Sequence, residues 1–191
     1  MKRLAIVTGI LALASPLLVA QTSSWAIDPA HSEADFSIRH LSISNVHGRL
    51  GKVTGILTYN EADITKSTVT ANIDLFGIDT GEAPRDTHLK TPDFFATDKF
   101  PTATFVSSSV ARDGSGLRIA GNLTLHGVTK SVTLAVEGPS TPIPGMDKKL
   151  HTGFSAHTTL SRADFGIGAK FPEAILGDSV KLTIELEAIK Q

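Results

Sequence analysis

The chain has 191 residues, 18 of them basic and 19 acidic, and 41% of the residues are hydrophobic. The net charge of −1 argues against the strongly basic surface typical of nucleic-acid-binding proteins, so no nucleic-acid partner is expected. The absence of cysteine excludes disulfides, a c-type haem attachment and a lipidated N-terminal cysteine.

The first predicted element is a cleavable secretory signal peptide over residues 1 to 20. A basic start, MKR, precedes the uncharged and mostly apolar run LAIVTGILALASPLLVA, which ends at the small residue Ala20. Small residues on both sides of Trp25 offer an alternative cut, and an uncleaved membrane anchor is a second alternative that Pro16 and the shortness of the run weaken. Cleavage leaves residues 21 to 191 as one domain with a net charge of −3.

Most of the remaining chain alternates apolar and polar residues, which places one set of side chains on each face of a β-strand. Short connections that contain Gly, Asn or Pro predict antiparallel pairing of strands in chain order. The eight candidate strands lie near residues 34–40, 53–59, 68–75, 103–110, 117–125, 132–136, 153–160 and 180–186.

An antiparallel sheet of this size loses its exposed edges by closing into a barrel. With about eight strands, the interior is either just filled by side chains or just able to hold one small ligand. Several of the inward candidates are small, among them Ala71, Gly121 and Ala156, which favours a hollow apolar lumen. A packed core without a ligand is the alternative.

Alternation stops over residues 80 to 101, TGEAPRDTHLKTPDFFATDKFP, so one or two short helices are expected there, around residues 80 to 100. The pair Thr91-Pro92 is typical of an N-cap followed by proline at the first helical position. The aromatic residues after this pair either cap one mouth of the barrel and gate entry, or anchor the helices to the barrel. They are Phe94, Phe95 and Phe100.

A hairpin is predicted over residues 121 to 134, GNLTLHGVTKSVTL, where alternation breaks at His126-Gly127 and then resumes. Gly127 supplies the positive φ that a tight turn requires. His126 is accordingly interpreted as a turn residue with a surface or capping hydrogen bond, and not as a catalytic group.

Other residues that often carry chemistry do not form a recognisable catalytic or metal-binding pattern. The seven histidines include no H-E-x-x-H motif and no pair four residues apart, although folding could still gather three of them around a metal. Asp28, His31 and Ser32 are the residue types of a hydrolase triad. They are expected to lie too close along one extended segment for a relay, and no G-x-S-x-G turn exists. No catalytic residue and no metal site are therefore predicted.

The tetrapeptide Arg85-Asp86-Thr87-His88 combines a base, an acid and a histidine within one predicted helical segment. It is interpreted as a set of salt bridges on the helix surface or between helix and barrel. The alternative is contact with the anionic head group of a ligand.

Six segments, in this order, make the sequence similar to the YceI-like family of periplasmic, polyisoprenoid-binding, lipocalin-like proteins. They run through the whole chain that follows the predicted signal peptide, so together they are far more specific than any one of them. The segments are IDPAHSEADFSIRHL at 27–41, VHGRLGKVTGIL at 46–57, IDTGEAPRDTHLKTPDFFATDKFPTATF at 78–105, GNLTLHGVTKSVTL at 121–134, FSAHTTLSRADFGI at 154–167 and GDSVKLTIELEA at 177–188.

This resemblance implies an all-β, eight-stranded antiparallel lipocalin-like barrel whose apolar lumen holds a long isoprenoid or related lipid. It implies location in the periplasm, no established catalytic residue and no cofactor besides the bound lipid. As partners it implies the lipid itself and, in some relatives, b-type cytochromes or stress responses. Transient contact with a membrane or such a cytochrome, and formation of a homodimer, stay open.

The residues expected to contact lipid are the apolar members of the alternating runs and the aromatic residues between them. They are Phe36, Ile38, Val69, Ala71, Ile73, Leu75, Phe105, Leu123, Leu125, Val132, Leu134, Phe154, Ala156, Phe165, Leu182 and Ile184. The candidates for contact with a polar head group are His40, Arg85 and His88.

Three functional hypotheses follow. The leading one is a periplasmic binding and transport protein for an isoprenoid quinone, a polyprenyl lipid or a fatty-acyl chain. The second is a filled-core interaction or stress-response module that serves a membrane redox system. The third is an enzyme that modifies a lipid through His40, His88 or Asp86 at the mouth of the barrel.

Overall fold

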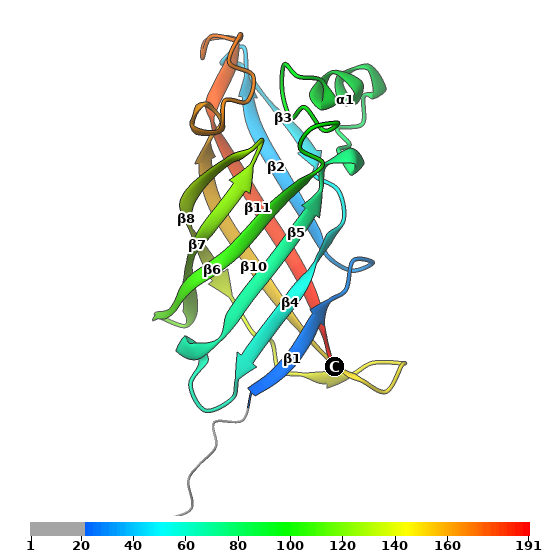
Figure 1. Ribbon diagram of the computed structural model, residues 1–191, viewed down its shortest axis with the longest axis vertical. Helices are drawn as coiled ribbons and strands as arrows, with labels where there is room; N and C mark the ends of the chain where they lie inside the picture. The colour runs from blue at the N-terminus through cyan, green and yellow to red at the C-terminus, as the bar shows by residue number, and fades with distance from the viewer. Residues whose placement is uncertain (1–21) are drawn as a thin grey trace, which may run out of the picture.

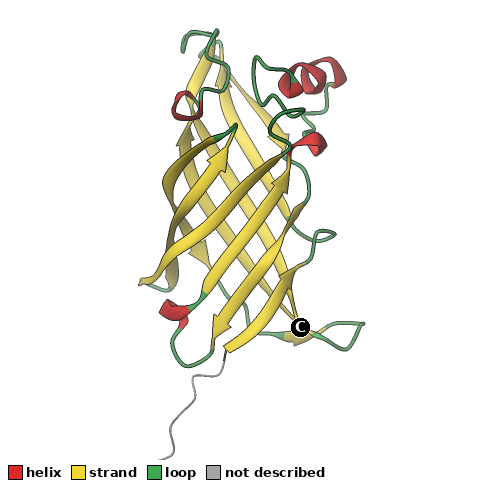
Figure 2. Cartoon of the chain, in the orientation of Figure 1, coloured by secondary structure: helices red, strands yellow, loops and turns green. Residues whose placement is uncertain are grey.

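The computed structural model describes residues 22–191, so the predicted signal peptide lies outside the described residues. Strands dominate, and the few helical turns lie near the two ends of the molecule (Figure 2). No helix within residues 22–191 is both long enough and apolar enough to cross a membrane. The strands are β1 Thr22–Ile27, β2 Glu33–His40, β3 Ser44–Arg49, β4 Val53–Asn60, β5 Thr68–Asp74, β6 Thr102–Asp113, β7 Gly116–Leu125, β8 Val128–Glu137, β9 Ile143–Pro144, β10 Leu150–Ser161 and β11 Leu176–Lys190.

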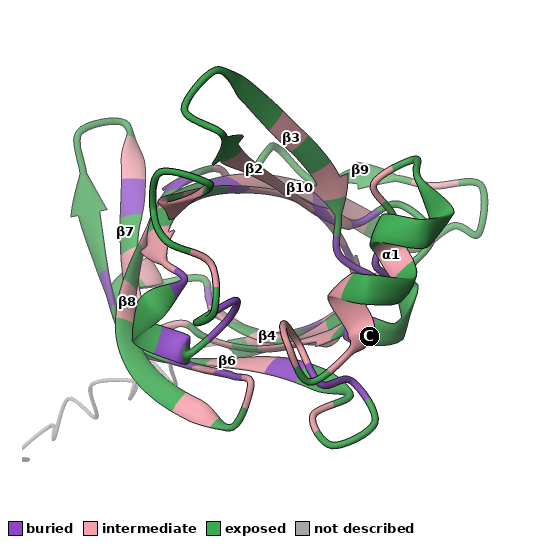
Figure 3. Ribbon diagram, turned by 90° about the horizontal axis from the view of Figure 1, so that it is seen from above, coloured by how far each residue is buried: buried purple, intermediate pink, exposed green. Residues whose placement is uncertain are grey.

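The strands form one closed antiparallel barrel (Figures 1 and 3). Each strand pairs with its neighbour in the ring β1-β4-β5-β6-β7-β8-β10-β11, and β11 returns to β1, so eight strands close the circle. The long β11 pairs with β1 through Ala188–Lys190 and with β2 through Leu176–Glu185. Strands β1 and β2 therefore lie one after the other along the same edge of β11, and together they fill one place in the ring. The predicted barrel is confirmed, and all eight predicted strands are present.

Three strands were not predicted from the sequence: β1, β3 and β9. Strand β1 has an alternating burial pattern, but its sequence TSSWAI is short and mostly small, and β3, SNVHGR, contains a single large apolar residue. Strand β9 comprises two residues. Each is held by pairing with a longer neighbour, and periodicity within so short a segment carries little signal.

The turn between β7 and β8 consists of His126 and Gly127, as predicted. Both residues have positive φ, 52° and 75°, which is the combination of a type I′ hairpin. A side chain at Gly127 would collide with the ring of Phe100. His126 is partly buried, and its Nδ1 lies 2.9 Å from the carbonyl oxygen of Phe165, so it joins the turn to a distant loop.

The helix in the interrupted segment differs from the prediction in its position. One α-helix, α1, spans Ala83–Lys90, and Thr91 ends it instead of beginning one. Pro84 stands in the first turn of α1, where its missing N–H costs nothing, whereas Pro92 disfavours helical backbone at Thr91. The Thr91 side chain donates to the carbonyl oxygen of His88 at 2.8 Å, which caps the C-terminal end.

The largest apolar cluster closes the end of the barrel that carries α1 (Figure 1). Leu75, the first residue of the 3₁₀ turn η2 (Leu75–Gly77), and Ile78, which follows that turn, are buried there with Phe165 from the 3₁₀ turn η3 (Ala163–Phe165). Phe94 and Phe95 pack against the same cluster. The loops at this end therefore fold inward and fill the barrel, which supports the anchoring interpretation of these two phenylalanines.

Candidate ligand-binding cavity

Beyond this cluster, the barrel interior contains a cavity. A cavity with an empty volume of about 1350 Å³, including the open space at its mouth, lies between inward-facing residues of β4 to β8, β10 and β11. It reaches the end opposite α1, where the β4–β5 connection with the 3₁₀ turn η1 (Ile64–Lys66) and the β8–β9 connection line it through Ile64, Pro139 and Pro142.

The wall of the cavity is almost entirely apolar. Its polar members are hydroxyl-bearing side chains, and no charged residue occurs among the described residues that line it. On β8 the inward-facing Val132 and Leu134 are only partly buried, because they border empty space, while the intervening Thr133 faces outward and is exposed. Such a wall solvates a hydrocarbon well and a charged molecule poorly.

Eleven of the sixteen residues expected to contact lipid line this cavity. They are Val69, Ala71, Ile73, Phe105, Leu123, Val132, Leu134, Phe154, Ala156, Leu182 and Ile184. Strand alternation located them correctly, because the inward set of each strand faces either the lumen or the core. Their contact with a ligand stays a prediction.

The other five do not line the cavity. Leu75, Leu125 and Phe165 are buried in the cluster that closes the α1 end, and Phe36 packs against that cluster. Ile38 is partly buried on β2, beyond the length of the barrel that is hollow. Alternation shows which face is inward, but it does not show where along a strand the interior is filled by loops.

Several residues that line the cavity were not predicted from the sequence. Trp25 and Tyr59, the only tryptophan and tyrosine of the chain, line the cavity from β1 and β4. Trp25 is 5% exposed, and its Nε1 donates to Ser23 Oγ at 2.9 Å. The sequence signal for Trp25 was a single large aromatic residue among the mostly small residues of β1. Pro139 and Pro142 belong to a connection, for which alternation gives no information.

The three head-group candidates lie outside the cavity. His40 is exposed at the end of β2. Arg85 donates from Nε to Thr80 Oγ1 at 2.7 Å and from Nη2 to the Thr80 carbonyl at 2.9 Å, which ties α1 to the preceding loop. His88 lies beside Asp93, with Nε2 3.5 Å from the carboxylate. Since all three are near the closed end, we assign no head-group contact to them.

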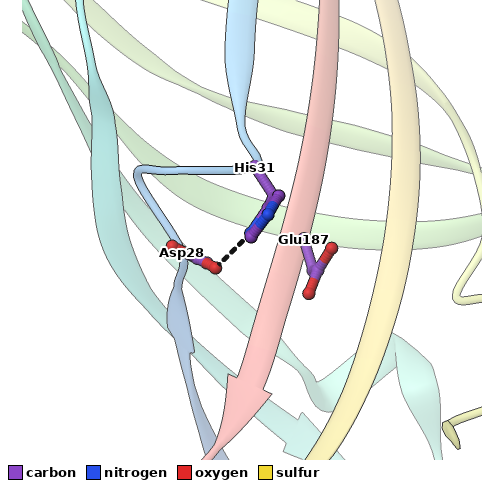
Figure 4. Close-up of side chains that lie close together, drawn as sticks. All are labelled: Asp28, His31 and Glu187. Atoms are coloured by element: carbon purple, nitrogen blue, oxygen red, sulfur yellow. Dashed lines mark hydrogen bonds and ion pairs between the residues drawn. The ribbon is translucent and has the colours of Figure 1, made fainter. Parts of the chain in front are cut away.

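Asp28, His31 and Glu187 form a polar cluster on the surface (Figure 4). His31 Nδ1 lies 2.7 Å from Asp28 Oδ2, because residues 28 to 31 form a turn and not the extended segment expected from the sequence. Ser32 is buried instead, and its Oγ accepts from the backbone N–H of Glu187 at 3.0 Å. The serine therefore does not face His31, and the residues form no triad.

His151 extends this cluster by bridging two carboxylates. Its Nδ1 lies 2.6 Å from Glu187 Oε1, and its Nε2 lies 2.9 Å from Asp147 Oδ1. The hydrogen bonds to Asp147 and Glu187 raise the pKa of His151, and the hydrogen bond to Asp28 raises the pKa of His31. These contacts join the turn after β1, the β9–β10 loop and β11, and they become ion pairs when the imidazoles are protonated.

Comparison with known proteins gives consistent matches over the whole barrel. The YceI-like domain matches residues 25–188. A UPF0312 protein of Vibrio cholerae serotype O1 (strain M66-2) is 34% identical, over 97% of this chain and 96% of its own length. A UPF0312 protein of Shewanella denitrificans is 39% identical, over 85% and 84%.

Solved structures match the fold closely. The YceI protein of Campylobacter jejuni is 30% identical, with a TM-score of 0.71, over 80% of this chain and 90% of that chain. A polyisoprenoid binding domain from Saccharophagus degradans, implicated in plant cell wall breakdown, is 17% identical, with a TM-score of 0.63, over 88% and 99%. The chain described here therefore belongs to the YceI-like family.

Proposed function

We propose that this protein binds a long isoprenoid or related lipid, such as an isoprenoid quinone, a polyprenyl lipid or a fatty-acyl chain, and carries it through the periplasm. The observation that supports this most strongly is the uncharged, apolar wall of the cavity. The polyisoprenoid-binding description of the S. degradans domain, which shares the fold, points to the same ligand class. The basic and apolar start of the sequence supports export.

The energetics suit a carrier. Burial of hydrocarbon is worth about 0.8 kcal/mol per methylene, so one five-carbon isoprene unit contributes roughly 4 kcal/mol before ordering costs. A few units inside the lumen suffice for firm binding from water. Against a bilayer, which is equally apolar, the net preference is small, so the same protein can accept a lipid from one membrane and release it to another.

Binding of intact lipid is proposed in preference to lipid chemistry. No histidine or carboxylate occurs among the described residues of the cavity wall. Asp86, one of the residues considered for an enzymatic role, accepts hydrogen bonds from the backbone and side chain of Thr80 and supports the start of α1. The residues of the wall can hold a chain and exclude water from it.

Trp25 allows a direct test, because it is the only tryptophan and lines the cavity. Titration of the purified protein with a long-chain isoprenoid quinone should quench Trp25 fluorescence in a saturable manner. Ala71→Phe should raise the apparent Kd about tenfold, because its ring displaces roughly two methylenes of ligand. Thr70→Phe places the same ring on the exposed face of β5 and should bind normally.

The proposal is wrong if the wild-type protein shows no saturable quenching and no competition by fatty acids or polyprenols. Equal Kd values for the two phenylalanine variants would place the ligand outside the lumen. Unchanged circular dichroism and urea unfolding would exclude misfolding of Ala71→Phe as the cause of weaker binding.

A further inference from the structure

A hairpin between β9 and β10 presents large apolar side chains to solvent. Met146 at its tip is 104% exposed, Ile143 is 63% exposed and Leu150 is 37% exposed. The hairpin projects from the end of the barrel opposite α1 (Figure 1). Exposed apolar side chains that cluster on a projecting element are typical of an interaction site.

The hairpin is held in place by hydrogen bonds and does not pack its apolar tip inward. The backbone N–H of Gly145 donates to the Lys149 carbonyl at 2.8 Å, which closes the loop. At its base, His151 bonds both Asp147 in the loop and Glu187 on β11. These hydrogen bonds fix the orientation of the loop, and they hold the Met146 side chain exposed to solvent.

Two lysines flank the apolar tip. Lys148 and Lys149 are exposed, and within residues 22–191 neither has a carboxylate within ion-pairing distance. The one acidic residue of the loop, Asp147, is already paired with His151. Apolar side chains beside unpaired lysines match the chemistry of an anionic bilayer surface, where phosphates lie above hydrocarbon.

The hairpin is also continuous with the mouth of the cavity. Pro142, which directly precedes β9, lines the cavity. Thr152 on β10 lines it as well. Thr152 donates to the Ser140 carbonyl at 2.8 Å, which joins the rim to the hairpin strand. A surface that receives the tip would therefore lie next to the opening.

A second exposed apolar group lies near the α1 end, and it provides a comparison. Leu41, Ile43 and Ile175 are 47%, 75% and 43% exposed. The interior at that end is filled by the large apolar cluster, so contact there would give a lipid no path into the lumen. Of these two exposed apolar groups within residues 22–191, the β9–β10 hairpin is the one that combines unpaired lysines with the open end.

We propose that the β9–β10 hairpin docks the protein on an anionic bilayer by inserting Met146 and Ile143 among the lipid head groups. Lys148 and Lys149 contact the phosphates, and the mouth of the cavity faces the membrane for lipid exchange. This inference rests on the proposed lipid-carrier function and adds the partner that the open end meets.

Vesicle flotation tests the inference with purified wild-type protein and single variants. The probes are vesicles of phosphatidylethanolamine with phosphatidylglycerol, and vesicles of phosphatidylcholine alone. Met146→Asp should lower the fraction bound to anionic vesicles about tenfold, through loss of an apolar anchor and repulsion by phosphates. Ile43→Asp, the same kind of change at the opposite end, should leave binding unchanged. Higher salt should weaken wild-type binding.

The inference is overturned if wild-type protein does not float with anionic vesicles, if Met146→Asp floats normally, or if Ile43→Asp removes binding. The extraction of lipid from the same preparations separates the two proposals. Bound lipid together with normal flotation of Met146→Asp would refute the docking surface and retain the carrier. Absence of lipid from all preparations, before and after incubation with vesicles, would refute the carrier and the exchange step with it.

Discussion

At the scale of single residues, Arg162 shows how the loop that closes one end of the barrel is held. The residue is 7% exposed. Its five N–H groups donate to five backbone carbonyls, those of Gly177, Ile167, Gly168, Phe171 and Leu176, at 2.8 to 3.0 Å. All donors of the guanidinium are therefore satisfied by one loop and the start of β11.

We predict that Arg162→Lys destabilises the protein although it conserves the charge. A lysine ammonium has three donors and lacks the planar fork, so at least two buried carbonyls lose their partners at about 1–3 kcal/mol each. The free energy of unfolding in urea should fall by about 3 kcal/mol. Arg39→Lys, on the exposed surface of β2, is the matched control. A loss below 1 kcal/mol for Arg162→Lys would contradict this account.

Single residues also show where sequence reasoning succeeds. The turn at His126-Gly127 could be predicted because the requirement for positive φ is local. The hydrogen bond from His126 to Phe165 could not, since its partner is 39 residues away. Thr91 was assigned to the wrong end of the helix because Pro84 and Pro92 carry the same local signal, and only the packing of the segment distinguishes them.

At the scale of elements, His151 fastens the β9–β10 hairpin to β11. The carboxylates of Asp147 and Glu187 surround its ring, and the hydrogen bonds to them raise the pKa of His151 above 6.5. The hydrogen bond from His151 lowers the pKa of Asp147 below 3.8 in turn. The contact therefore contributes most in the pH range where the imidazole is charged and the carboxylate is ionised.

We predict a pH-dependent stability difference between the wild-type protein and His151→Asn. A raised folded-state pKa means that this contribution is fully present below the unfolded value of 6.5 and is lost as pH rises through the folded value. Urea unfolding at about pH 6 and about pH 9 should show a difference that is larger at the lower pH.

The matched control for this prediction is His157→Asn, on the exposed face of β10. Its effect on unfolding should be small. The account of His151 is wrong if the difference in unfolding free energy between the wild-type protein and His151→Asn is the same at both pH values, or if it is larger at the higher pH.

At the scale of the whole molecule, one barrel has a filled end and a hollow end. The inward residues of the strands follow the same alternation along the entire length, so the sequence could predict a closed barrel with an apolar interior. It could not separate Leu125, buried in the core, from Leu134, which borders the cavity. The difference arises from loops, because Phe94 and Phe165 fold into one end while prolines of the β8–β9 connection only border the other.

The central claim is that the hollow part of the barrel holds a lipid. The most direct measurement is native mass spectrometry of the protein purified from a bacterial expression host without detergent, followed by identification of the lipids in its organic extract. The account predicts a hydrocarbon-chain lipid at close to one molecule per chain. A clean protein mass without an adduct, which persists after incubation with isoprenoid quinones and fatty acids, would contradict it.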